Sequence, residues 1–222
     1  MSEVVPKISS KRSTIASLVR QKILSGEWPP GMRLTEKMLC EQTGASRSSV
    51  RETLHMLLQE GFVSNEPNRG FRVATLDASE AADIYQVRSV LEGLAARNFV
   101  NMASKEERAA LDDALVELEK AIAEEDVKKQ LAAIDAFYRA LLDGCYNEVL
   151  KLTLQGLHGK IARLRATSIL SPGRIRQTLK EMQRIGEAIR QNDEDAAFQA
   201  CVDHMRYTVA VAVRTIQALR AR

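Results

Sequence analysis

The segment from Gly44 to Glu52, Gly-Ala-Ser-Arg-Ser-Ser-Val-Arg-Glu, constrains the fold of this chain more than any other part of its sequence. It has the pattern of a turn followed by a helix, in which the Ser46 side chain can accept a hydrogen bond from the amide of Ser48 or Ser49. Two arginines and two hydroxyls then occupy the first helical turns. The apolar positions behind them, spaced as on one buried helix face, are Val50, Leu54, Leu57 and Leu58. A polar N-terminal end on an anchored helix is typical of a helix that enters the DNA major groove.

The elements predicted around this helix complete a small domain. Helices are expected over about residues 14–24, 35–43 and 46–61, and strands over 62–65 and 71–74. Residues 32–34 could form a further, very short strand. A turn-rich tip that carries Arg69 and Gly70 joins the two main strands into a hairpin. Three helices and a hairpin make a winged helix-turn-helix, which we assign to residues 1–76.

From residue 77 onward the sequence predicts helices only. They are expected over about 79–103, from a capping box at Ser104, and over 127–145, 147–167, 171–191 and 193–220. The fifth of them should begin with Ser171 as N-cap and Pro172 as its first residue. The predicted fold class is therefore mostly α, with an all-α bundle of about six helices over residues 77–222.

The charge is distributed unevenly along the chain. Residues 1–76 carry 11 Lys/Arg against 7 Asp/Glu, or +4, and residues 77–222 carry 21 against 22, or −1. The net charge of +3 is too small to indicate nucleic acid by itself, but a basic N-terminal unit before a neutral one agrees with a DNA-binding domain at the N-terminus.

Several function classes are disfavoured by composition. Cys40, Cys145 and Cys201 are far apart in sequence and form no zinc or redox motif. No apolar run approaches the roughly 18 residues of a membrane span, so we expect a cytoplasmic protein without membrane contact. None of the three histidines falls in a nucleophile–base motif, and no phosphate-binding glycine loop is present, so we expect no enzymatic activity.

Motifs in both predicted domains point to one family. They are Ser25-Gly26-x-x-x-Pro30-Gly31-x-x-Leu34, Gly44-x-Ser46-Arg47-x-x-Val50-Arg51-Glu52-x-Leu54, Gly61-Phe62-Val63, Arg69-Gly70-Phe71-x-Val73 and Val87-Arg88-x-x-Leu91-Glu92. With these motifs the chain resembles the GntR family of bacterial transcriptional regulators, in the FadR-type subgroup whose effector domain is the helical FCD bundle. The resemblance covers roughly residues 14–215.

The resemblance implies a set of DNA contacts. The positions that match the family's contacts are Lys37, Arg47, Ser48, Ser49, Arg51, Arg69 and Gly70. Arginine suits bidentate contact with guanine or phosphate, and a small hydroxyl can donate to phosphate. Arg33 fits a solvated surface charge equally well. Family members dimerise, so the implied partners are a second copy of the chain and a pseudo-palindromic double-stranded operator.

Many FCD domains hold a divalent metal with one aspartate and three histidines, but this chain departs from that pattern. The corresponding positions here are Ile134, Tyr138, Met182 and His204. A single imidazole cannot form a tight divalent site, which needs several N, O or S ligands. We therefore expect no metal and no cofactor.

The resemblance also implies a small effector in the bundle, and many relatives sense organic acids. The predicted effector contacts are Arg88, Tyr138, Met182 and His204. His204 fits a bonded core histidine equally well, and Tyr138 and Met182 are more often core residues than ligand contacts. Arg88 lies on an otherwise apolar stripe and needs an anion, which could be Glu92 one turn on, the carboxylate of an effector, or each in turn.

The sequence therefore predicts a DNA-binding transcriptional regulator, a repressor, controlled by a small carboxylate-bearing effector. The alternative is an architectural DNA-binding protein whose bundle serves only dimerisation.

Overall fold

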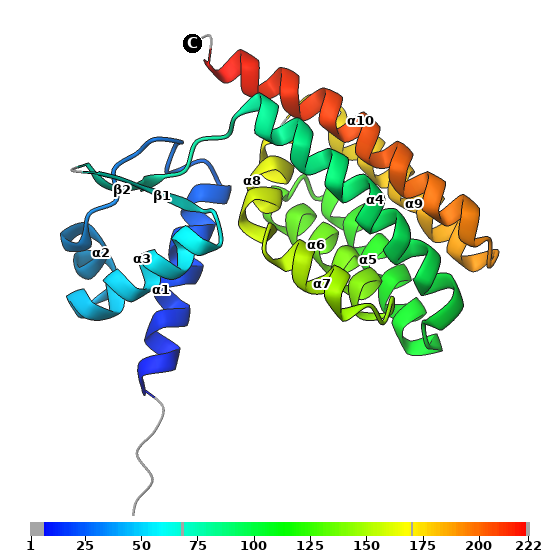
Figure 1. Ribbon diagram of the computed structural model, residues 1–222, viewed down its shortest axis with the longest axis horizontal. Coiled ribbons are helices and arrows are strands. Elements are labelled where there is room, and N and C mark those ends of the chain that lie inside the picture. Colours follow the sequence, from blue (N-terminus) through cyan, green and yellow to red (C-terminus); the bar gives the residue numbers. More distant parts are fainter. Residues whose placement is uncertain (1–6, 68, 170, 221–222) are drawn as a thin grey trace, which may run out of the picture. The chain divides into compact units, whose positions relative to one another are not determined.

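The computed structural model describes residues 7–67, 69–169 and 171–220 of the 222-residue chain (Figure 1). The chain packs as two compact units. One comprises Met1–Leu76 with Gly156–Arg163, and the other comprises Asp77–Gln155 with Leu164–Arg222. The change of unit after Leu76 lies at the predicted boundary, whereas the short segment 156–163 was predicted to lie in the second domain.

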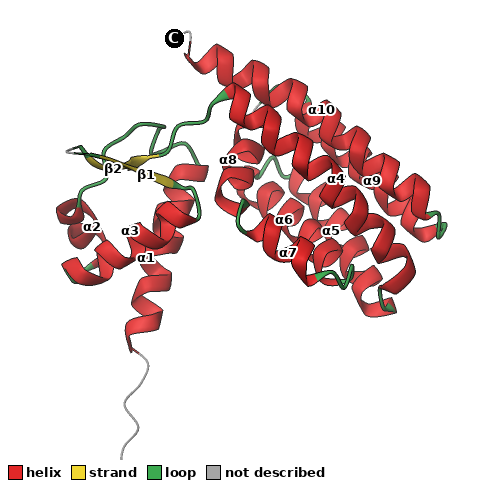
Figure 2. Ribbon diagram, in the orientation of Figure 1, coloured by secondary structure: helices red, strands yellow, loops and turns green. Residues whose placement is uncertain are grey.

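The N-terminal unit is a winged helix-turn-helix, as predicted. Its elements are α1 (Lys7–Leu24), α2 (Glu36–Thr43), α3 (Arg47–Gln59), β1 (Val63–Glu66) and β2 (Gly70–Val73). The two strands pair antiparallel, with Val63 opposite Val73, and Arg33 adds an isolated bridge to Arg72 in place of the short strand considered for residues 32–34. Figure 2 shows the two strands as the sheet of this unit. Helix α1 begins at Lys7, earlier than the predicted Thr14.

Local capping fixes the two helices that form the DNA-binding element. Thr35 accepts a hydrogen bond from the Met38 amide at 3.2 Å and starts α2. Gly44 ends that helix in the left-handed conformation, with φ 64°, which a residue without a Cβ adopts at low cost. Ser46 then caps α3 by accepting from the Ser49 amide at 3.3 Å, as the sequence predicted.

The apolar face of α3 anchors it in the core of its unit. Val50, Leu54 and Leu57 are completely buried, whereas the fourth predicted position, Leu58, is only partly buried. Val50, Leu54 and Leu57 belong to one buried cluster, and Leu58 packs against it. The cluster also includes Val19, Leu39, Phe62 and Val73. Burial of this stripe fixes which end and face of α3 remain exposed.

Seven helices form from the described residues after Leu76. They are α4 (Ala78–Met102), α5 (Lys105–Ala123), α6 (Val127–Asp143), α7 (Glu148–Gln155), α8 (His158–Ile169), α9 (Arg174–Arg190) and α10 (Glu194–Arg220). Helices α4 and α10 run side by side (Figure 1), and α5 pairs with α6 and α10 with α9. None of the described helices is both long and apolar enough to cross a membrane.

Two local predictions for these helices were wrong. The single helix expected over 147–167 is two helices, interrupted at residues 156–157 where Gly156 weakens helical structure. The expected cap at Ser171-Pro172 is also absent, since α9 has Gly173 as its N-cap, with φ 73° and no side-chain capping bond. The later start makes Arg174 the first residue of α9, which matters for the site below.

Candidate functional site

The predicted DNA contacts on α3 lie together at its exposed N-terminal end. Arg47, Ser48 and Arg51 are exposed, and Ser49 is partly exposed. The Ser46 hydroxyl lies 3.0 Å from the hydroxyls of both Ser48 and Ser49, so the cap also orders these two side chains. The structure thus places two guanidinium groups and two hydroxyls on one helix end, where a groove-inserted helix makes its contacts.

The other predicted contacts lie on α2 and at the wing. Lys37 is 83% exposed on α2 and makes only a loose ion pair with Glu41, at 3.9 Å. Arg69 is 72% exposed beside the wing tip, 3.5 Å from Glu66. Gly70 has φ 72°, so a side chain there would strain the turn into β2. All seven predicted contact residues belong to the N-terminal unit, and each is at least partly exposed.

One acidic residue, Glu36, contacts α3, which carries the predicted base contacts and is called the reading helix below. Arg51 Nε donates to Glu36 Oε1 at 2.7 Å and Arg51 Nη2 donates to Oε2 at 3.2 Å, which joins α3 to the first residue of α2. The hydrogen bond from Arg51 lowers the pKa of the Glu36 carboxyl below its ordinary value, so Glu36 is ionised at neutral pH.

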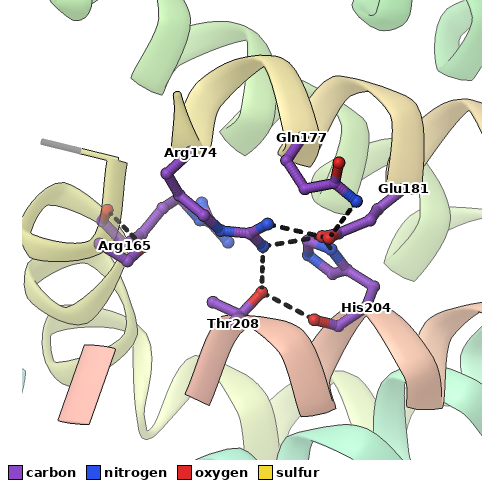
Figure 3. Close-up of polar contacts among 7 residues, drawn as sticks. Arg165, Arg174, Gln177, Glu181, His204 and Thr208 are labelled. Carbon is purple, nitrogen blue, oxygen red and sulfur yellow. Dashed lines mark hydrogen bonds and ion pairs between the residues drawn. The ribbon is translucent and has the colours of Figure 1, made fainter. Parts of the chain in front are cut away.

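The second unit contains a buried polar network between α9 and α10 (Figure 3). Arg174 donates to Glu181 through both terminal nitrogens, at 2.9 and 2.7 Å, and to the Thr208 hydroxyl at 2.7 Å. Glu181 also accepts from Gln177 at 3.1 Å, and its Oε2 lies 2.6 Å from Nδ1 of His204. Thr208 in turn donates to the backbone carbonyl of His204 at 2.8 Å.

The charge states in this network follow from burial and from the partners. Burial raises the pKa of Glu181, but hydrogen bonds from His204 and Arg174 outweigh it and lower the pKa to about 2. Burial lowers the pKa of His204 despite the neighbouring carboxylate, so the imidazole is neutral at pH 7 and donates from Nδ1 to Glu181. The network therefore holds one cation and one anion, both buried.

A second buried ion pair lies on α4. Arg88 Nε donates to Glu92 Oε1 at 2.7 Å, and the Arg88 side chain is only 2% exposed. The guanidinium lies over two phenol rings, 5.1 Å from the centroid of Tyr85 and 5.7 Å from that of Tyr138. Burial works against the charged form of Arg88, but Glu92 and the phenols outweigh it and raise its pKa. The pairing with Glu92 considered from the sequence is thus present.

Residues of both groups line one small, partly open cavity of about 20 Å³, room for roughly one water molecule. Its lining residues are Tyr85, Arg88, Ile134, Tyr138, Arg165, Ser168, Ile169, Thr178, His204 and Thr208. Three of the four predicted effector residues, Arg88, Tyr138 and His204, therefore share its wall. Met182 is fully buried but does not line it.

Two residues of the cavity wall carry hydroxyls without partners. The hydroxyls of Tyr85 and Tyr138 are buried and have no hydrogen-bond partner among the described residues, and the same holds for one oxygen of Glu92, the partner of Arg88. Arg165, the second cation in the wall, is bonded to Asp135 and lies 4.8 Å from the Tyr138 ring centroid. The wall thus carries two guanidinium groups, each paired with a carboxylate, and two phenol hydroxyls without a partner in the described part of the chain.

An open groove lies on the outer side of the same network. It runs between α9 and α10 with a volume of about 410 Å³, and its wall includes Glu181, His204 and Tyr207. His204 lines both this groove and the small cavity. The neutral imidazole is therefore the side chain that the two spaces share.

Sequence reasoning missed several residues of this region. Arg174, Thr178 and Glu181 are buried on α9, and Arg165 is buried on α8. Their signal was present, because residues 174, 178, 181, 185 and 188 follow one helical stripe whose later members are apolar. The apolar spacing of Ile175, Leu179, Met182 and Ile189 predicts a different inward face, of which Met182 and Ile189 are buried and Ile175 and Leu179 are only partly buried.

The donor groups at the family's metal positions do not fit a divalent cation. Ile134, Tyr138 and Met182 supply no carboxylate or imidazole, and Nδ1 of His204 is bonded to Glu181. The nearest charged partner of that carboxylate is the guanidinium of Arg174, which would repel a second cation. Within the described parts of the chain, no group of three or more His, Cys, Asp or Glu side chains is arranged to hold a metal ion.

A winged helix-turn-helix joined to an all-helical unit is a domain arrangement of DNA-binding transcriptional regulators. Comparison with known proteins identifies the family. The family described as bacterial regulatory proteins, gntR family, matches residues 11–73, and the FCD domain matches residues 83–207. The chain belongs to the GntR family of bacterial transcriptional regulators and carries an FCD domain.

Individual relatives agree with this assignment. An uncharacterised HTH-type transcriptional regulator of Bacillus subtilis, YdhC, is 29% identical over 190 residues, 85% of each chain. The Glc operon transcriptional activator of Escherichia coli is 27% identical over 218 residues, 86% of this chain and 85% of its own. Escherichia coli McbR/YncC has a solved structure with TM-score 0.79 and 20% identity, covering 95% of this chain and 99% of its own, which shows the shared fold.

Proposed function

We propose that this protein is a repressor that binds a pseudo-palindromic operator as a dimer and releases it when a small carboxylate-bearing effector binds the helical unit. The observation that carries the effector part is the cavity wall, where Arg88 and Arg165 lie against the rings of two phenols whose hydroxyls have no partner among the residues that the structure describes. In this function the protein acts in the cytoplasm, without a catalytic step and without a metal cofactor.

The size of the cavity suggests how binding could change the protein. A space of about 20 Å³ does not admit an organic acid, so the effector must displace part of the wall. The Arg88–Glu92 pair and the His204 side chain are the elements to move, because the first can exchange Glu92 for a ligand carboxylate and the second borders the outer groove. The shift in conformation is limited by the effector's differential affinity for the two states.

The same small volume favours the second candidate function, an architectural DNA-binding protein with no effector. In that case the helical unit serves only dimerisation, and the two phenol hydroxyls remain without partners.

Binding of small carboxylic acids distinguishes these two functions. Thermal unfolding is measured with a panel of mono- and dicarboxylic acids and, as controls, their uncharged amides. We expect one acid to raise the unfolding temperature and to weaken binding to DNA, while its amide does neither. If no acid shifts unfolding or DNA binding, the architectural function is the correct one. A promoter reporter then separates repression from activation.

Removal of either arginine of the reading helix should weaken specific DNA binding. We expect Arg47→Ala and Arg51→Ala each to reduce affinity by roughly 1–3 kcal/mol, because each removes a charge-assisted contact to a base or phosphate. The measurement is gel-shift titration on a duplex selected by the wild-type protein from a randomised pool. Arg206→Ala, which removes an exposed arginine of the other unit, serves as control and should leave affinity unchanged. Wild-type affinity in a folded Arg47→Ala or Arg51→Ala variant would remove that residue from the contact set.

A further inference from the structure

Glu36 places a negative charge beside the surface that is proposed to meet a polyanion. It is the first residue of α2, and its side chain is 28% exposed, while that of Arg51 is 63% exposed. A carboxylate at this position opposes phosphate binding unless its partner compensates it. The partner here is Arg51, so the contact affects how that arginine can bind DNA.

The geometry of the pair leaves one edge of the guanidinium available. Arg51 uses Nε–H and one N–H of Nη2 for the Glu36 carboxylate. Of the five N–H donors of an arginine, the two on Nη1 and one on Nη2 remain. The remaining donors on Nη1 and Nη2 form the end of the planar fork, which is the edge that matches O6 and N7 of guanine in the major groove.

Arg47 provides a contrast on the same helix. Among the described residues, no carboxylate lies within ion-pair distance of Arg47, which acts on Glu36 only through its charge, whereas Arg51 is fixed to Glu36 in a bidentate pair. A free guanidinium can follow any nearby phosphate, and a fixed one can be directed at a base. The negative charge of Glu36 also makes approach of a phosphate to Arg51 less favourable.

We propose that Glu36 is a specificity-determining positioning residue, which holds Arg51 so that the end of its guanidinium reads a guanine and does not bind phosphate. This inference rests on the proposed function, in which Arg51 contacts DNA. Glu36 itself makes no DNA contact in this arrangement and acts through Arg51.

The test compares Glu36→Gln with a matched control, Glu41→Gln. Glu41 lies on the same helix, is exposed, and is near Lys37, so its variant removes the same charge without touching Arg51. For each full-length variant, affinity is measured over a range of salt for the duplex selected by the wild-type protein and for a random duplex of equal length.

For Glu36→Gln we expect the ratio of selected to random affinity to fall about tenfold, mainly because random binding strengthens. The logarithmic salt dependence on random DNA should steepen by about one for each bound protomer, since each freed Arg51 gains a phosphate contact. Glu41→Gln should leave the ratio unchanged. A new selection with Glu36→Gln should lose preference at the same guanine position as a selection with Arg51→Ala.

Other outcomes would overturn the inference in distinguishable ways. If Arg51→Ala weakens selective binding but Glu36→Gln keeps the wild-type ratio, Arg51 is a contact and Glu36 does not position it. If Glu36→Gln weakens both duplexes equally with an unchanged salt slope, Glu36 has only a structural role. If Arg51→Ala itself leaves binding to the selected duplex unchanged, both the contact and the inference are wrong.

Discussion

Replacement of Arg174 by methionine should lower the free energy of unfolding by about 3–5 kcal/mol, because it leaves a buried carboxylate without its cation. The Arg174 and Glu181 side chains are 4% and 2% exposed and share two hydrogen bonds. After the substitution Glu181 retains only Gln177 and the neutral His204, which do not balance its charge. Urea unfolding at pH 7 and fixed protein concentration measures the change.

A control variant and the pH dependence make the prediction for Arg174→Met specific. Arg206→Met removes an exposed arginine and should change stability by no more than about 0.5 kcal/mol. The pKa of Glu181 is lowered to about 2 in the folded protein. Ionised Glu181 therefore contributes its full stabilisation above the ordinary carboxyl pKa, and this stabilisation is lost as the pH falls from there toward about 2. The difference in unfolding free energy between wild type and Arg174→Met should therefore narrow in acid.

Wild-type unfolding should be the same with and without a chelator, and a lower midpoint with chelator would contradict our expectation of no bound metal.

Replacement of Arg88 by methionine should have a similar effect, about 3–5 kcal/mol, for the same reason. Glu92 is buried, its Oε1 accepts from Arg88, and its Oε2 has no hydrogen-bond partner among the described residues. The double variant Arg88→Met/Glu92→Leu removes both charges and should recover most of the loss, to within about 1–2 kcal/mol of wild type. Urea unfolding of the two single variants and the double variant completes the cycle.

The double variant also tests the effector role of Arg88 without the loss of stability. We expect it to bind the selected duplex as wild type does and to show no response to the carboxylic acid identified by thermal shift. A normal response would show that the acid binds elsewhere, and Arg88 would then be a structural residue paired with Glu92. If Arg88→Met alone is as stable as wild type, the buried pair is not the energetic unit described above.

The reading helix could be predicted from the sequence because all its determinants are local. The cap at Ser46, the stripe from Val50 to Leu57 and the glycine before them each follow from spacing within a few residues. The same holds for the capping box at Ser104, which the structure shows with both of its hydrogen bonds. These features depend little on what the rest of the chain does.

The network in the helical unit could not be predicted because it contradicts the usual rule that charged residues face solvent. Arg174 and Glu181 are buried only because each satisfies the other, a condition that hydrophobic periodicity does not register. The predicted start of α9 was also wrong, since Gly173 and not Ser171 precedes the helix. The volume of the cavity depends on side-chain packing and is not encoded in any local pattern.

The Arg174 guanidinium has one consequence for the physiology of a regulator with this domain. This positive charge is part of the polypeptide, so unlike a bound metal ion it cannot dissociate or be exchanged. The charge that balances Glu181 is therefore present in every folded molecule, whatever the metal content of the cell.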